Sequence, residues 1–85
     1  MVINHLQEIK ESLSFYILNR MFNKAIELSK EFLKYKIDAD ILYFMGLAYE
    51  GLNKKNEAIE KFREVLSINP NKEEAYEHLK KLVSD

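Results

Sequence analysis

The sequence predicts an all-α protein of five helices, and three observations lead to this prediction. The 85 residues include only two Gly and one Pro, far below the average usage of about 7% and 5%, which disfavours a fold built on many tight turns. Apolar residues recur every three to four positions in five separate stretches, as on one face of a helix. Moving the chain along itself by 33 residues, from position 23 to position 56, aligns two similar segments, which indicates a repeated unit.

The five apolar stretches give the expected helices in order, and turn-forming residues separate them. Their approximate bounds are Ile3–Ile17, Phe22–Leu33, Leu42–Tyr49, Ala58–Leu66 and Tyr76–Val83. Asp38 or Asp40 is expected to cap the third helix, and Asn71 with Glu74 is expected to cap the fifth. Pro70 is expected to end the fourth helix, because a residue without a backbone N–H cannot continue the hydrogen-bonded ladder. Successive helices then form antiparallel hairpins.

Length and composition exclude several classes of protein. A chain of 85 residues buries only about 60–65% of its unfolded surface, so residues 1–85 are expected to form one domain without a second core. The net charge of −1 lacks the attraction to phosphate that nucleic-acid binding needs. No apolar run approaches the roughly 20 residues that span a bilayer, and the lack of Cys suits a reducing compartment. We expect a cytoplasmic protein with no membrane insertion and no nucleic-acid partner.

The residue types that catalysis or metal binding requires are scarce. There is no Cys nucleophile and no Gly-rich loop for phosphate. The two histidines, His5 and His78, lie near opposite ends of the chain, and a His with one neighbouring Glu is too few ligands for a metal. We therefore expect no enzymatic activity, no metal and no cofactor.

Seven residues at fixed spacing carry a resemblance to a known family. They are Leu42, Met45, Gly46, Tyr49, Ala58, Phe62 and Pro70. Their pattern resembles the tetratricopeptide repeat (TPR), a helical hairpin of 34 residues. The resemblance implies a first repeat at about residues 6–38, a second at about 39–72 and a capping helix at about 72–84. It also implies that the hairpins stack as a short right-handed solenoid, with Gly46 and Ala58 allowing close helix packing.

The first repeat departs from the family pattern at three positions. Leu13 stands where the small Gly is expected, Ser29 replaces an aromatic residue, and Ile37 stands where Pro would end the unit. These departures affect the expected helix crossing but not the hairpin itself. Lys80 occupies the position of Gly46 in the last helix, which predicts that no further helix packs tightly there.

Members of this family are protein-interaction modules, so the resemblance implies a protein or peptide partner. It also implies that the partner binds on the concave surface, which is lined by the first helix of each unit. Tyr43, Phe44 and Leu47 are expected on that side of the third helix, where a purely structural helix would carry charge. We expect them to form an apolar floor for a partner's side chains. The edges of this groove are expected to come from Lys10, Ser14 and Ile17 on the first helix and from Glu74, Glu77 and His78 on the last.

Several alternatives accompany this hypothesis. In one alternative, the terminal helix or a neighbouring copy covers the three floor residues. In another, they are ordinary exposed apolar residues. Repeat arrays usually need three or more units, so the chain is alternatively a scaffold that self-associates as a homodimer, through Val2, Ile3, Leu6 and Phe15, or a fragment of a longer array. One TPR subclass binds the C-terminal carboxylates of chaperones, but only Lys10 matches the residues of that clamp.

Overall fold

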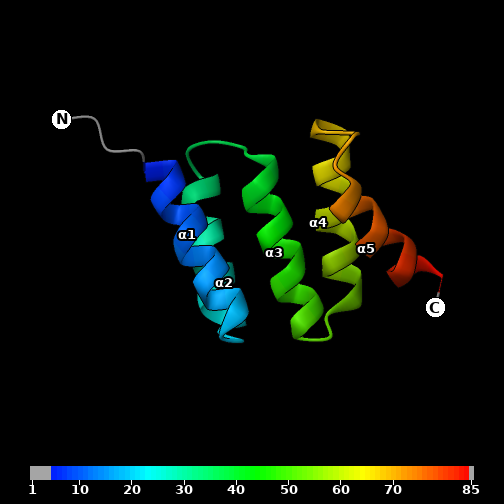
Figure 1. Cartoon of the computed structure of the whole chain (residues 1–85), viewed down its shortest axis with the longest axis horizontal. Coiled ribbons are helices and arrows are strands. Elements are labelled where there is room, and N and C mark those ends of the chain that lie inside the picture. Colours follow the sequence, from blue (N-terminus) through cyan, green and yellow to red (C-terminus); the bar gives the residue numbers. More distant parts are fainter. Residues whose placement is uncertain (1–4, 85) are drawn as a thin grey trace.

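The computed structural model describes residues 5–84, and five α-helices account for most of this range (Figure 1). They are α1 (His5–Leu18), α2 (Phe22–Leu33), α3 (Ala39–Gly51), α4 (Lys55–Ile68) and α5 (Glu73–Val83). No strand occurs among the described residues, so the all-α prediction is confirmed. Val2 and Ile3, which were expected to add exposed apolar surface, lie outside the described residues.

The helices form a row of antiparallel hairpins. In Figure 1, α2 lies behind α1, α3 stands in the middle of the row with α4 returning beside it, and α5 crosses in front of α4. The packing follows this order: α1 contacts α2 and α3, α3 also contacts α2 and α4, and α4 contacts α5. Each hairpin therefore packs on its neighbour along the chain, as the resemblance implies. The right-handed superhelix stays a prediction.

The two hairpin turns share one backbone geometry. Arg20 and Asn53, the described non-Gly residues with positive φ, have φ of 58° and 60° and are one 33-residue shift apart. The chain then folds back onto the preceding helix through equivalent backbone bonds, Met21 N to Tyr16 O at 2.7 Å and Lys54 N to Tyr49 O at 2.9 Å. This arrangement is a Schellman ending, in which a left-handed residue lets the chain reverse while the last carbonyls of the helix stay bonded. Both hairpins are thus closed by the same device.

The two predicted helix caps have opposite outcomes. Asp38 has an extended backbone and its Oδ1 accepts the N–H of Ile41 at 3.0 Å, so it is the cap of α3. The capping role of Asn71 is wrong, because the residue before α5 is Lys72, which makes no side-chain cap bond. Asn71 instead donates its backbone N–H to Oδ1 of Asn69 at 3.3 Å. That bond belongs to the turn after α4 and leaves Asn71 one residue too early to cap α5.

The expectation of a single core is also wrong, because α3 is buried on two faces. One cluster of buried residues joins α3 to the first hairpin and consists of Leu13, Ala25, Ile26, Ile41, Met45 and Ala48. The other joins α3 to α4 and α5 and consists of Leu42, Ala58, Phe62, Val65, Ala75 and Leu82. A row of hairpins has no common centre, so each pair of neighbouring units buries its own set of side chains.

Gly46 marks the closest approach of α3 and α4. A Cβ atom at this position would lie 2.7 Å from a ring carbon of Phe62, which no real Cβ contact allows. Phe62 and Ala58 are fully buried beside it. The rest of the repeat pattern lies as follows: Leu42 and Met45 are buried, Tyr49 is half-buried, and Pro70 is exposed just beyond α4.

Candidate functional site

The third face of α3 carries the predicted floor residues, which the two clusters cover only in part. Tyr43, Phe44 and Leu47, which we call the central strip, are each half-buried. Phe44 packs partly on the first cluster, whereas Tyr43 and Leu47 pack partly on the second. The rings of Tyr43 and Phe44 lie 6.3 Å apart between their centroids. The central strip therefore stays partly accessible at the middle of the row.

One end of the central strip is closed by a charge network that joins three segments. Asp40 on α3 lies 2.8 Å from Nζ of Lys10 on α1 and 3.3 Å from Nζ of Lys72, which directly precedes α5. Lys72 also places its ammonium 4.9 Å from the centroid of the Tyr43 ring, a favourable cation–π geometry. The hydrogen bond from Lys10 lowers the pKa of Asp40 and raises the pKa of Lys10. Lys10 therefore lies at the predicted edge, with its charge already paired.

The other end is closed by a contact between α3 and α5. His78 Nδ1 lies 2.7 Å from Glu50 Oε1, and the imidazole stacks on Phe62 with ring centroids 5.2 Å apart and an interplanar angle of 23°. The same imidazole meets the edge of Tyr43 at 5.9 Å. Burial, followed by the charges of Glu74 and Glu50, raises the pKa of Tyr43. His78 therefore holds α5 against α3 and does not project freely toward a partner.

The remaining predicted edge residues lie on opposite sides of α3. Ser14 and Ile17 are half-buried on α1, and Ile17 packs partly on the first cluster. Glu74 and Glu77 are exposed on α5, and the ion pairs among residues 5–84 include neither of them. These two carboxylates are free to meet a cationic group beside the central strip.

A comparison with protein-family models identifies the repeat. The model described as "Tetratricopeptide repeat" matches residues 39–72, which are α3, α4 and the turn that follows. This match and the five helices fit a TPR-like repeat protein. No curated protein and no solved structure matches it in the two other comparisons.

Four charged residues that frame the site in this TPR-like protein were not among the predicted site residues. Asp40 and Glu50 lie on the helical stripe of the central strip, three residues before Tyr43 and three after Leu47, so their spacing carried a usable signal. Lys72 and Lys81 approach them from outside α3, with Lys81 Nζ 3.9 Å from Glu50. Lys81 lies on the same helical stripe as Glu77 and His78, which placed it on this side of the last helix. No local pattern indicates Lys72, because its contact with Asp40 crosses 32 positions of sequence.

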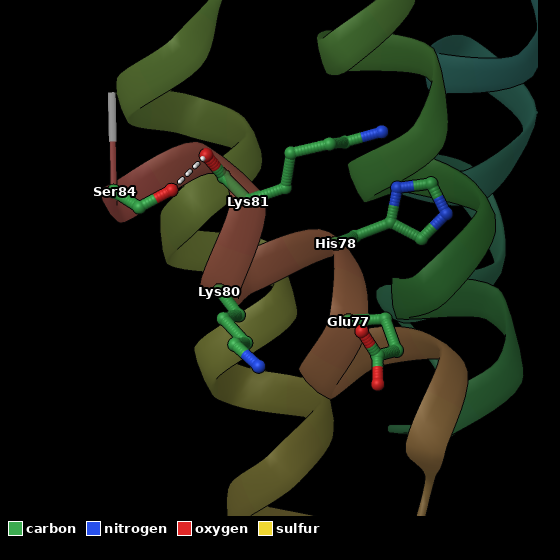
Figure 2. A pocket seen from close by; sticks show the side chains of 5 residues that line it. All are labelled: Glu77, His78, Lys80, Lys81 and Ser84. Atoms are coloured by element: carbon green, nitrogen blue, oxygen red, sulfur yellow. Dashed lines mark hydrogen bonds between the residues drawn. The ribbon is translucent and has the colours of Figure 1, made fainter.

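A shallow hollow of about 360 Å³ lies along α5 (Figure 2). It is lined by Glu77, His78, Lys80, Lys81 and Ser84. His78 and Lys81 point toward α3, while Lys80 points away from them (Figure 2). The hollow is therefore bordered by the site on one side and by the outer side of α5 on the other.

Two further findings concern residues 5–84 alone. No three His, Cys, Asp or Glu side chains in this range come close enough together to hold a metal ion. None of its helices has both the length and the apolar character needed to cross a membrane.

Proposed function

We propose that this chain is a non-enzymatic interaction module that holds a peptide or a partner helix against the central strip, between α1 and α5. Tetratricopeptide repeats are in general protein-interaction modules, and the match at residues 39–72 supports such a role for this chain. The proposed binding position at the central strip rests on the difference between the faces of α3. Two faces are packed into clusters, whereas Tyr43, Phe44 and Leu47 keep apolar surface accessible.

The energetics support a shared role for the strip and its acidic edge. Full burial of one large apolar side chain contributes about 1.5–3 kcal/mol, and half-buried residues have part of that gain left to offer. Micromolar affinity requires about 8 kcal/mol in net terms after the costs of association. We therefore propose that Glu74 and Glu77 contribute as well, by meeting basic groups of the partner.

The charge pattern argues against a chaperone-tail clamp. Lys10 is the one clamp position that matches, and its ammonium is bound to Asp40. Phe44, Glu74 and His78 occupy positions where the clamp has Asn or basic residues. A terminal carboxylate would meet repulsion from Glu74, so we propose an internal peptide segment or a helix as the ligand. The net charge of −1 likewise favours a protein over a nucleic acid, and composition favours the cytoplasm as its location.

The double variant Phe44→Ala with Leu47→Ser tests this proposal. Partners are captured from a cell lysate on immobilised protein, and each captured partner is then titrated against purified protein. We expect the variant to weaken binding at least about tenfold, because the buried apolar area is lost. Tyr35→Ala with Ile37→Ser, two exposed apolar residues away from the strip, is the matched control. Unchanged binding by the first variant, with its thermal unfolding still cooperative, contradicts the proposal.

A further inference from the structure

The outer side of α5 has no neighbour in this molecule, although the same positions are covered in the preceding unit. Tyr76, Lys80 and Val83, which we call the outer face, stand 34 positions after Leu42, Gly46 and Tyr49. In the preceding unit those three residues lie on the face of α3 that packs against α4. On α5, Tyr76 is 54% exposed and Val83 is 51% exposed. The outer face of α5 is thus open, whereas the equivalent face of α3 packs against the antiparallel helix α4.

Charges along this side of α5 are sorted by sign. Glu73 and Glu77 precede Lys80, and all three are exposed. The ion pairs among residues 5–84 include none of them. When two such helices run antiparallel, the acidic half of each faces the basic half of the other, so Glu77 of one copy meets Lys80 of the second copy twice across a two-fold axis. The surface is complementary to itself, as a two-fold interface requires.

The hollow on α5 lies beside the outer face. Four of its lining residues, Glu77, Lys80, Lys81 and Ser84, are spaced as i, i+3, i+4 and i+7. Four residues at this spacing form the hole that accepts one side chain of a facing helix in knobs-into-holes packing. Lys80 and Lys81 diverge around it (Figure 2). Lys80 belongs to both the hollow and the outer face, so the hollow borders the surface that a second helix would cover.

We propose that two copies of this chain associate through the outer faces of their α5 helices, which pack antiparallel. The second α5 then takes the place that α4 has on α3. This surface differs from the α1 surface expected from the sequence, which stays a separate prediction; α1 carries Glu8 and Ser12 where α3 has the buried Ile41 and Met45. One helix of 11 residues offers less than the roughly 1,200 Å² of a standard interface, so we expect a weak dimer. Lys80, which stands where α3 has Gly46, also keeps the two helices from packing as closely as α3 and α4 do.

Sedimentation equilibrium of the purified chain at concentrations from about 10 µM to about 1 mM tests the proposal, because dissociation constants in this range are expected for a small interface. We expect the average mass to rise from monomer toward dimer. Tyr76→Ala should weaken the association about tenfold or more, because it removes the largest apolar side chain of the outer face. Phe15→Ser on α1 should leave it unchanged. A monomer at every concentration, or a dimer abolished by Phe15→Ser and retained in Tyr76→Ala, overturns the proposal.

Two charge reversals give the sharper test. Glu77→Lys and Lys80→Glu should each weaken self-association about tenfold, because both symmetric ion pairs become repulsive. An equimolar mixture of the two variants should associate at least as well as the wild type, since the opposite charges then face each other in a heterodimer. Glu27→Lys and Lys24→Glu on α2, also exposed, are the matched controls and should change nothing. A mixture that associates no better than its components overturns the proposal.

This association and partner binding at the central strip use different residues except Glu77, which borders both surfaces. All of these measurements use the chain alone, whereas the proposed function is tested with a partner and with substitutions at Phe44 and Leu47. Loss of one activity in a variant that keeps the other identifies which of the two proposals fails.

Discussion

At the residue scale, the two hairpins exchange bulk between equivalent positions. In the second hairpin Gly46 lies against the ring of Phe62. The equivalent residues of the first hairpin are Leu13 and Ser29, and both are completely buried. The large side chain has therefore moved from the second helix of the unit to the first, and the small one has moved the other way. The two departures from the family pattern compensate each other in volume, which cores tolerate well.

The first residue-scale prediction concerns Gly46→Ala. Replacing Gly by Ala within a helix gains about 1 kcal/mol, but the added methyl would lie 2.7 Å from the fully buried Phe62 ring. Overpacking of this kind costs about 1–3 kcal/mol, so we expect the net free energy of unfolding to fall by about 1 kcal/mol. Urea denaturation measures it, and Phe62→Leu should recover part of the loss in the double variant. A more stable Gly46→Ala protein would show that the ring can move aside.

The second residue-scale prediction concerns Ser29, whose Oγ is buried without a hydrogen-bond partner. An unsatisfied buried hydroxyl costs about 1–3 kcal/mol, so Ser29→Ala should raise the free energy of unfolding by about 1 kcal/mol or more. Ser12→Ala is the matched control, because Ser12 is exposed in α1 and gains only the higher helix propensity of Ala, about 0.5 kcal/mol. Equal gains in the two variants would mean that burial of the Ser29 hydroxyl carries no cost.

At the scale of elements, α3 organises the molecule. Its two packed faces take part in both clusters, and its third face holds charged residues that fix the helices on either side. Asp40 joins α3 to Lys10 of α1 and to Lys72 at the start of α5. Glu50 joins it to His78. The spacing of α1, α3 and α5 around the central strip therefore depends on two carboxylates of one helix.

The pH dependence of stability reports the Asp40 network. The pKa of Asp40 is lowered from 3.8 in the folded chain, chiefly by the hydrogen bond from Lys10. Its stabilisation is therefore complete above the unfolded pKa and is lost as the pH falls through the lower folded value. Because the pair is partly exposed, we expect Asp40→Asn to cost at most about 1 kcal/mol at pH 7. The raised pKa of Lys10 acts on the alkaline side, where its contribution is lost as the pH rises above 10.5.

Chemical denaturation of the wild type and Asp40→Asn at neutral and strongly acidic pH measures this effect. The difference in the free energy of unfolding should shrink toward zero as the pH falls below the folded pKa of Asp40. Glu27→Gln on the exposed side of α2 serves as the control and should show no such trend. A difference that persists at acidic pH would assign the effect of Asp40 to packing, since its charge is then absent.

At the scale of the whole molecule, the sequence predicted what depends on local periodicity. The five helices and the stripe that carries the central strip follow from apolar spacing and from the Gly46 pattern. The contacts that bring α5 to α3 did not follow, because His78 and Glu50 are 28 positions apart and nothing local pairs them. The turn at Arg20 was also missed, since Arg is an unusual residue for positive φ. No sequence pattern singled out Gly51, although the ring of Phe22 leaves no room for a Cβ there.

The last prediction follows from the shared position of α3. Leu13 is fully buried in the cluster that joins α3 to the first hairpin, so Leu13→Ala should lower the free energy of unfolding by about 2–4 kcal/mol. Because the same helix also completes the cluster with α4 and α5, the amides of both hairpins should lose protection together in hydrogen exchange. Phe15→Ala, an exposed change on the same helix, should alter protection little. Retained protection in α4 and α5 alongside faster exchange in α1 and α2 would instead show that the two clusters unfold as separate units.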